Sequence, residues 1–170
     1  MIKLIATDID GTLVKDGTLI IDPEYMTVIS KLIDKGIIFT VCSGRQFSSE
    51  QKLFAPIKDK LMYITDGGTV VRTPDRILKT YPMSNELWKD MCRMVRDELP
   101  ACDYFAASPD LCYAEDGASP IFHRLRDSYG FEMREIDDLT KLENDDIIKF
   151  TVYHPDSCEE LCSPHFIPAW

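Results

Sequence analysis

An apolar run near the start of the chain ends in two carboxylates, and this combination limits what the chain can fold into. Residues 2–7 are mostly aliphatic, as in a strand buried on both faces of a parallel sheet. The run stops at Asp8 and Asp10, which one residue separates and which Gly11 and Thr12 follow. Carboxylates are costly to bury without a partner, so we expect both at the exposed end of the strand.

The spacing of the two acids indicates a shared cation. Side chains two residues apart in an extended segment lean to the same side, so Asp8 and Asp10 should lie close together. Two like charges at that distance either repel each other or share a cation. Mg²⁺ commonly binds one or two carboxylates together with a phosphorylated substrate. The pattern therefore predicts Asp8 and Asp10 as metal ligands, with Gly11 allowing the chain to turn sharply beside them.

Strand and helix patterns alternate over the first 80 residues, which predicts a parallel sheet with helices on its faces. In open sheets of this kind, ligands bind at the carboxyl ends of the strands. We therefore expect Asp8, Asp10, Ser43, Gly44 and Asp66, which follow three successive strands, to meet at one edge. In chain order, the elements expected after the first strand are a hairpin over 14–21 around Asp16-Gly17, a helix from Asp22-Pro23 to Gly36, a strand over 37–42, a short helix over 46–54, a strand over 61–65 and a hairpin over 69–80.

The rhythm changes after residue 80, and we place a boundary near residues 81–83. Ser84 can cap a helix that runs to Leu99 with one apolar face. Short strands and helical pieces then mix, which is typical of an α+β unit. The strands are expected over 103–107, 111–115, 131–136 and 147–153, and the helical pieces over 121–129 and 157–162.

The charge balance excludes some classes of partner. The chain has 29 acidic and 19 basic residues and a net charge of −10, so it lacks the basic character of a nucleic-acid or anionic-membrane binder. No segment has the length and apolarity of a membrane span. The six cysteines are scattered rather than arranged in a dense framework, and we interpret them as reduced thiols of a cytoplasmic protein.

The three strand ends also carry a resemblance to a known family. Asp8-Ile9-Asp10-Gly11-Thr12-Leu13 is similar to the opening motif of the haloacid dehalogenase-like hydrolases. Ser43-Gly44-Arg45 matches the second motif of that superfamily. Asp66-Gly67-Gly68, followed by a hairpin and an inserted mixed domain, resembles the Cof-type subfamily of sugar-phosphate and related phosphatases. The resemblance implies an α/β fold: a Rossmann-like parallel sheet over 1–82 and an inserted α+β cap domain over 83–170.

The resemblance further implies a Mg²⁺-dependent phosphatase that acts on small phosphorylated metabolites through an aspartyl-phosphate intermediate. Asp8 would be the nucleophile. Asp10 would act as general acid and then general base, and its backbone carbonyl would also bind the metal. Thr12, Ser43, Gly44 and Arg45 would bind phosphate or substrate, with Ser43 and the backbone around Gly44 at a helix N-terminus. The cap would close over the site and select the substrate.

The sequence departs from the family pattern in its last part. The family continues into further strands that bring a phosphoryl-neutralising Lys and an acidic pair for Mg²⁺, whereas this sequence corresponds to the first two-thirds of such an enzyme. Lys141 and Lys149 fall inside the expected cap and do not match that Lys. The alternative function is therefore a catalytically inactive fragment that folds as an oligomer and binds phosphate or Mg²⁺ weakly. Without the later strands, residues 2–7 would form an uncovered edge through which the chain could dimerise or assemble further.

Individual residues keep simpler interpretations beside these roles. Ser43 could cap the following helix, Arg45 could pair with a surface acid, and Asp66 fits a turn residue better than a catalytic one. A Ca²⁺ loop of the EF-hand type fails, because Ala6 and Gly17 stand where it needs acids. Four residues near the end of the sequence suggest zinc, but they would be spread too far along one helix to share an ion. These are His154, Cys158, Cys162 and His165, and we interpret the two cysteines as the apolar face of a short helix.

Overall fold

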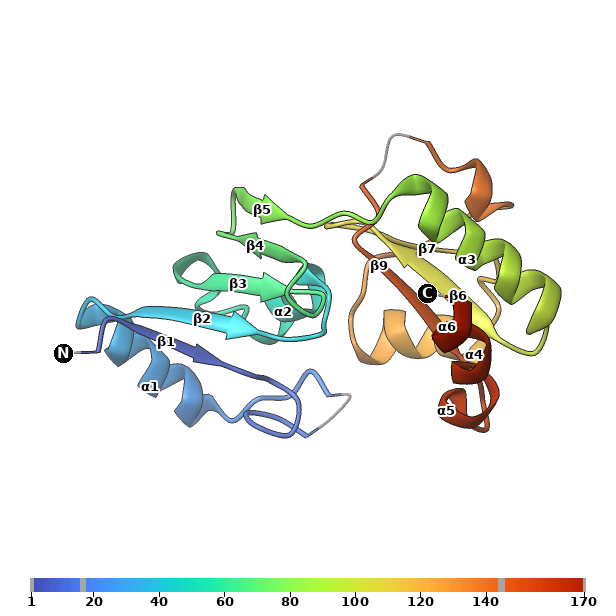
Figure 1. The fold of residues 1–170 in the computed structure, drawn as a ribbon. Coiled ribbons are helices and arrows are strands. Elements are labelled where there is room, and N and C mark those ends of the chain that lie inside the picture. The colour runs from blue at the N-terminus through green and yellow to red at the C-terminus, as the bar shows by residue number, and fades with distance from the viewer. Residues whose placement is uncertain (1, 16–17, 144–145, 170) are drawn as a thin grey trace. The chain divides into compact units, whose positions relative to one another are not determined.

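The computed structural model describes residues 2–15, 18–143 and 146–169. It divides into two compact units, which are drawn in Figure 1 and are described separately here. The first comprises Met1–Tyr81 and Arg124–Glu132, and the second comprises Pro82–His123 and Met133–Trp170. The segment Arg124–Glu132, which the sequence assigned to the inserted domain, thus belongs to the first unit.

The first unit is built on a five-stranded sheet in the order β1-β2-β3-β4-β5. β1, β2 and β3 are parallel, as the sequence predicted, while β4 and β5 form the expected hairpin and run antiparallel to their neighbours. The sheet is therefore mixed. In chain order the elements are β1 (Leu4–Thr7), α1 (Pro23–Asp34), β2 (Ile38–Cys42), α2 (Phe47–Leu53), η1 (Lys58–Lys60), β3 (Met62–Thr65), β4 (Val70–Arg72) and β5 (Ile77–Thr80).

Helix α1 begins and ends at the signals that its sequence carries. The Asp22 side chain accepts a hydrogen bond from the backbone N–H of Glu24 at 2.8 Å, and Pro23 occupies the first turn, where a missing N–H costs nothing. At the other end Gly36 adopts a φ of 78°, and its N–H donates to the carbonyl of Ile33 at 2.8 Å.

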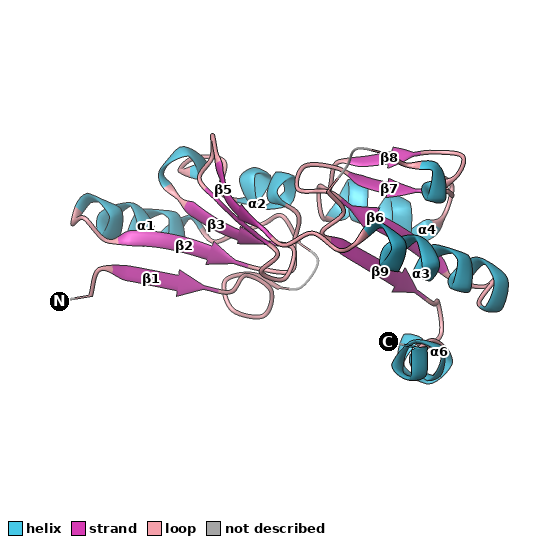
Figure 2. Cartoon of the chain, turned by 45° about the horizontal axis from the view of Figure 1, so that its top comes forward, coloured by secondary structure: helices cyan, strands magenta, loops and turns pink. Residues whose placement is uncertain are grey.

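Helices α1 and α2 pack on the same face of the sheet, so among the described residues the predicted helices of the first unit cover one of its faces. Ile29 of α1 and Phe47 of α2 belong to one core with Phe39 and Tyr63, and Figure 2 shows α1 and α2 on the same side. The cause is the strand order. Right-handed crossovers that move from β1 to β2 and then from β2 to β3 advance in one direction, which places both helices on one face.

Strand β1 lies at the edge of this sheet and is only half-buried, contrary to the expectation of burial on both faces. Leu4 is 53% exposed and Ile38 on the neighbouring strand is 49% exposed, both on the face that α1 and α2 leave open. The uncovered edge that the sequence predicted is therefore present among the described residues. The expected hairpin centres on Asp16-Gly17, outside the described residues, and no strand forms over 18–22.

The second unit has a four-stranded sheet in the order β8-β7-β6-β9. β6 pairs antiparallel with both β7 and β9, whereas β7 and β8 are parallel. Helix α3 begins at the predicted Ser84 cap and places Trp88 and Cys92 in a core with Ala106 and Tyr113. The elements are α3 (Asn85–Glu98), β6 (Asp103–Ala107), β7 (Cys112–Ala114), α4 (Pro120–His123), β8 (Met133–Glu135), η3 (Leu139–Lys141), β9 (Lys149–Tyr153), α5 (Cys158–Leu161) and α6 (Ser163–Ala169); a π-helical turn, η2 (Arg124–Ser128), lies in the first unit.

In the ranges that the structure describes, no helix combines the length and the apolarity that crossing a bilayer would require.

Candidate active site

The parallel strands β1, β2 and β3 deliver their carboxyl ends to one edge, as the sequence predicted. Backbone hydrogen bonds join the turns that follow β2 and β3. The N–H of Asp66 donates to the carbonyl of Arg45 at 2.9 Å, and the N–H of Gly67 donates to the carbonyl of Ser43 at 3.0 Å. The two turns therefore form one surface whose geometry the main chain fixes.

The turn after β1 is closed by the carbonyl of Ile9. It accepts the backbone N–H groups of Leu13 at 2.8 Å and Val14 at 3.1 Å, while Gly11 adopts a φ of 77°. The Thr12 hydroxyl donates to Oδ2 of Asp8 at 3.3 Å. Asp8 itself is exposed, so its carboxylate is accessible to a ligand.

Asp10 and Arg45 form a two-point ion pair between the turns after β1 and β2. Arg45 donates from Nε to Oδ2 at 2.8 Å and from Nη2 to Oδ1 at 2.6 Å. The pair has the parallel geometry that makes Arg–carboxylate contacts strong. The Arg45 side chain is only 2% exposed. Its partner is Asp10 of the candidate site and not the surface acid that the sequence also allowed.

Ser43 and Gly44 lie in the turn after β2, but not at the start of a helix. Helix α2 begins at Phe47 with Gln46 as its N-cap, and Gln46 makes no side-chain cap bond there. Ser43 is buried, and its Oγ accepts the backbone N–H of Arg45 at 3.1 Å. Ser43 therefore stabilises its own turn, and its hydroxyl hydrogen is directed elsewhere. The expectation that Ser43 and Gly44 form the N-terminus of α2 is wrong by three residues.

Asp66 is a turn residue with a left-handed backbone, at a φ of 54°. It is buried, and its Oδ2 accepts the hydroxyl of Thr65 at 2.8 Å. The placement fits the structural role that the sequence favoured for Asp66.

Glu50 is a buried acid near the site that the sequence reasoning missed. It is 0% exposed, and neither carboxylate oxygen has a hydrogen-bond partner among the described residues. Burial raises the pKa of Glu50 well above its ordinary value; the nearby Asp66 carboxylate raises it further, and Arg45 opposes the shift. The signal was available, because Glu50 interrupts an otherwise apolar helix face between Phe47 and Leu53.

Glu50 and Asp8 both act on the thiol of Cys42 at the end of β2. Burial is the largest cause that raises the pKa of Cys42, and electrostatic interactions with the Glu50 carboxyl and then with Asp8 add to it. Acids therefore surround the end of β2, and the Arg45 guanidinium lies among them as a buried cation.

A second group that the sequence did not reveal ties Arg124–Glu132 to helix α2. The Gln46 side-chain amide accepts the N–H of Glu132 at 2.6 Å and donates to its carbonyl at 3.3 Å. Lys52 donates to the carbonyl of Gly130 at 2.8 Å and pairs with the Glu132 carboxylate at 2.7 Å. These contacts join residues about 80 positions apart in sequence, which explains why no local pattern predicted them.

The fixed segment places Tyr129 beside the site. The guanidinium carbon of Arg45 lies 5.1 Å from the centre of the Tyr129 ring, within the range of a cation–π interaction. Arg45 is thus held by Asp10 through its Nε and Nη2 atoms and is covered by an aromatic ring. Its orientation depends on a segment that the sequence assigned to the other domain.

The oxygen donors at this edge fit a hard cation that keeps several waters, because the exposed Asp8 carboxylate offers a ligand that Mg²⁺ prefers. The carboxylate of Asp10, the second predicted ligand, is engaged by Arg45 instead. Within the described ranges no three His, Cys, Asp or Glu side chains are grouped so that they could hold a metal. The same finding covers the four residues considered for zinc.

Comparison with protein families decides the ancestry of this site. A family model for haloacid dehalogenase-like hydrolases matches residues 5–165. The chain belongs to that family. The resemblance seen in the sequence is therefore confirmed, as is the α/β fold with a second, cap-like sheet.

Two curated phosphatases are similar to parts of this chain. The 5-amino-6-(5-phospho-D-ribitylamino)uracil phosphatase YbjI of Escherichia coli is 26% identical over 147 residues, which is 84% of this chain and 52% of that protein. The phosphatase of the same name from Bacillus subtilis, YwtE, is 32% identical over 87 residues, covering 51% of this chain and 30% of the relative. The chain thus spans about half or less of these relatives.

Solved structures share the fold. A crystal structure from Eubacterium rectale is 82% identical, with a TM-score of 0.87, and the match covers 99% of this chain and 64% of that one. The subclass IIB sugar phosphatase BT4131 is 17% identical with a TM-score of 0.74, covering 97% of this chain and 64% of that one.

Replacing Glu50 by Gln should remove a pH dependence of stability. The unfolded carboxyl ionises near its ordinary pKa while burial raises the pKa of the folded one, so the free energy of unfolding falls as pH rises from about 4.5 toward the raised pKa, by up to about 1.4 kcal/mol per pH unit. Glu50→Gln lacks this loss and should be more stable than the parent at pH 7, with the difference closing near pH 4. Urea unfolding between pH 4 and 8 measures it.

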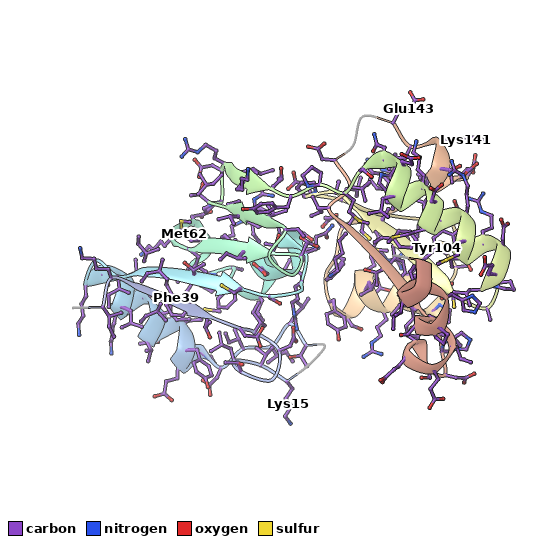
Figure 3. All side chains as sticks on the ribbon, in the orientation of Figure 1. Lys15, Phe39, Met62, Tyr104, Lys141 and Glu143 are labelled. Atoms are coloured by element: carbon purple, nitrogen blue, oxygen red, sulfur yellow. The ribbon has the colours of Figure 1, made fainter. Side chains whose placement is uncertain are left out.

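The exposed Glu143, labelled in Figure 3, supplies the control. Glu143→Gln should leave the pH profile of unfolding unchanged. An identical pH profile for Glu50→Gln and the parent would show that Glu50 ionises normally in the folded chain.

Gly130→Ala should loosen the segment that carries Tyr129. Gly130 has a φ of 72°, and an added Cβ would lie 2.9 Å from Cδ of Lys52 and 3.2 Å from Cδ1 of Leu19. The left-handed backbone alone costs about 1–2 kcal/mol with Ala, so the free energy of unfolding should fall by at least that amount. Gly36→Ala is the matched control, because Gly36 has a φ of 78° with nothing within 4 Å. Equal losses in the two variants would mean that the Lys52 contact does not constrain Gly130.

Proposed function

We propose that this chain belongs to a Mg²⁺-dependent phosphatase that hydrolyses small phosphorylated metabolites through an aspartyl-phosphate intermediate. The observation that carries the proposal is the exposed Asp8 carboxylate at the strand edge where Ser43 and the Asp10–Arg45 pair also lie. Family membership supports it.

In this proposal Asp8 attacks the phosphorus of a phosphate monoester. A bond forms between its carboxylate oxygen and phosphorus as the bond to the alcohol oxygen breaks, and that oxygen takes a proton from Asp10. Asp10 then removes a proton from the water that hydrolyses the aspartyl-phosphate, which returns both acids to their starting states.

The ion pair with Arg45 gives this proton transfer a structural consequence. Asp10 donates a proton only when its carboxyl is neutral, and a neutral carboxyl loses most of its attraction for the Arg45 guanidinium. Arg45 is then available to a phosphoryl oxygen, which it suits in charge and geometry. We propose that Arg45 exchanges its Asp10 contact for the phosphoryl group of the substrate.

The remaining phosphate contacts would come from hydroxyl and backbone donors. The Ser43 hydroxyl accepts its bond from Arg45 and keeps its own hydrogen for a phosphoryl oxygen. Thr12 and the N–H of Gly44 are the other candidates, and Thr12 already orients Asp8. Mg²⁺ bound by Asp8 and Asp10 would neutralise charge on the phosphoryl oxygens.

The substrate class comes from the relatives. Two relatives bear the name of a ribitylaminouracil phosphate phosphatase, and one related structure is a sugar phosphatase. We therefore propose a phosphorylated sugar or polyol derivative as substrate, with the second unit as the cap that selects it. The six cysteines are scattered along the sequence, which suits a cytoplasmic location.

The second candidate is a catalytically inactive chain that binds phosphate or Mg²⁺ weakly. It is favoured by the engagement of Asp10 with Arg45 and by the lack, within the described ranges, of a group of three metal-binding side chains. A loss of cationic stabilisation would remove much of the rate of phosphoryl transfer.

The two candidates differ in the hydrolysis of a generic aryl phosphate measured with and without Mg²⁺. If the chain is an enzyme, we expect Mg²⁺-dependent turnover. Asp8→Asn should lower the rate of hydrolysis by at least about a thousandfold, since the nucleophile is lost. Asp34→Asn, on the exposed side of α1, is the matched control and should retain the parental rate. Equal and negligible rates for the parent and Asp8→Asn would select the inactive chain.

We also propose that the chain self-associates through the β1 edge, with a second copy as the partner. A free strand edge offers unpaired N–H and C=O groups, and the apolar Leu4 and Ile38 are exposed beside it. Pairing of two β1 edges would satisfy these backbone groups and extend the sheet.

Light scattering at increasing concentration checks this assembly. The parent should exceed the mass of one chain, 19.5 kDa, and Leu4→Lys should shift it toward the monomer, because an edge lysine opposes pairing. Leu161→Lys, at an exposed leucine of the second unit, should not change the mass. A parent that stays monomeric at the highest concentration would refute the proposal.

A further inference from the structure

Two thiols of the second unit face each other across a long stretch of sequence. Cys102 lies in the turn between α3 and β6, and Cys162 lies at the junction of α5 and α6. Their Sγ atoms are 3.4 Å apart, although 60 positions separate them in the chain. Neither residue takes part in the candidate active site.

The backbone around each thiol holds it in place. The N–H of Cys102 donates to the carbonyl of Leu99 at 2.9 Å, which closes the turn after α3. The N–H of Cys162 donates to the carbonyl of Cys158 at 2.9 Å within the α5 turn. Cys162 is 4% exposed and packs with Val95 and Leu99, and Tyr104, labelled in Figure 3, packs against the same cluster. The approach of the two sulfurs is therefore part of the packed core of this unit.

Each of the two cysteines lines an opening of the second unit. Cys102 lines a cavity of about 260 Å³ together with Pro100 and Asp103. Cys162 lines a separate groove of about 460 Å³ with Phe150 and Phe166. Cys102 is the more exposed of the two, so a reagent from solution meets the pair at Cys102.

We propose that Cys102 and Cys162 are a site of reversible thiol oxidation and form an intramolecular disulfide with a low-molecular-weight disulfide such as oxidised glutathione. The Cys102 thiolate attacks one glutathione sulfur, forming a mixed disulfide and releasing one glutathione thiolate. The Cys162 thiolate then attacks the Cys102 sulfur and releases the second glutathione. The protein loses two electrons and two protons, and the reagent is reduced to two glutathione thiols.

Exposure sets the order of the two steps. Cys102 is half-buried and Cys162 is almost fully buried, so the bulky reagent meets Cys102 first. Burial raises the pKa of the Cys162 thiol, and the adjacent Cys102 sulfur raises it further, so its thiolate is scarce at neutral pH. Cys162 suits the second step, in which a neighbouring sulfur replaces a reagent from solution.

A third cysteine nearby does not compete on equal terms. The Sγ of Cys158 accepts the backbone N–H of His154 at 3.0 Å and donates to the carbonyl of Val152 at 3.5 Å. Cys158 also makes a side-chain hydrogen bond with Cys162, but its bonds to His154 and Val152 hold it at the end of β9. Cys162, which the sequence analysis considered as a zinc ligand, is thus assigned to thiol oxidation instead.

The disulfide would join the start of β6 to the α5–α6 junction. A crosslink that closes a loop of this length stabilises mainly by restricting the unfolded chain. We therefore expect oxidation to raise the melting temperature of the chain by at least about 5 °C. The inference does not depend on the proposed phosphatase activity.

The test uses the reduced full chain, incubated with oxidised glutathione and then treated with an alkylating reagent under denaturing conditions. Peptide mapping should find Cys102 linked to Cys162, with the other four of the six cysteines alkylated. The melting temperature should rise, and dithiothreitol should return it to the reduced value.

Variants separate this site from other thiol reactions. Cys102→Ser and Cys162→Ser should each abolish the linked peptide and the rise in melting temperature, while Cys158→Ser and Cys42→Ser should retain both. Because Cys162→Ser changes a buried residue, the reduced melting temperature of every variant is measured first, and Cys102→Ser alone suffices if Cys162→Ser does not fold. Alkylation of all six thiols, a stable glutathione adduct on Cys102, a Cys158–Cys162 link, or a link between two chains would each overturn the proposal.

Discussion

The ion pair between Asp10 and Arg45 is the interaction on which the candidate site depends. It joins the turn after β1 to the turn after β2 and places a buried cation among several acids. Arg45 is held on its other sides as well, since Nη1 contacts Oγ of Ser49 at 3.5 Å and the Tyr129 ring covers it. A buried guanidinium without its carboxylate would be strongly unfavourable, so the two turns and the Tyr129 segment must form together.

Local signals in the sequence predicted the elements well, because each is decided by a few neighbouring residues. The Asp22-Pro23 start and Gly36 end of α1 and the Ser84 cap of α3 are examples. Which faces are covered is a different matter. An apolar run such as that of β1 occurs both in strands at the centre of a sheet and in strands at its edge, so the sequence does not distinguish the two positions. Leu4 is exposed because β1 comes first in the strand order. Periodicity identifies a face that is apolar but not the element that covers it.

In the candidate site, too, the sequence predicted some features and not others. The rule that ligands bind at the carboxyl ends of parallel strands brought together Asp8, Asp10, Ser43 and Asp66 from sequence alone. The rule does not predict the contact of Gln46 with Glu132, because these residues lie 86 positions apart in the sequence. The position of Tyr129 beside Arg45 follows from that contact. The residues that carry the proposed chemistry were predictable, whereas those that hold them in place were not.

Glu50 shows what such a site requires of the surrounding core. Its carboxyl is buried with no hydrogen-bond partner in the part of the chain that the structure describes, and an unsatisfied buried polar group costs about 1–3 kcal/mol. A core selected for stability alone would carry an apolar residue between Phe47 and Leu53. A neutral Glu50 adds no charge to the acids around Arg45, whereas an ionised one would compete with Asp10 for the guanidinium. The burial that disfavours the ionised form of Glu50 therefore also favours the pairing of Arg45 with Asp10, which links this buried carboxyl to the central interaction of the site.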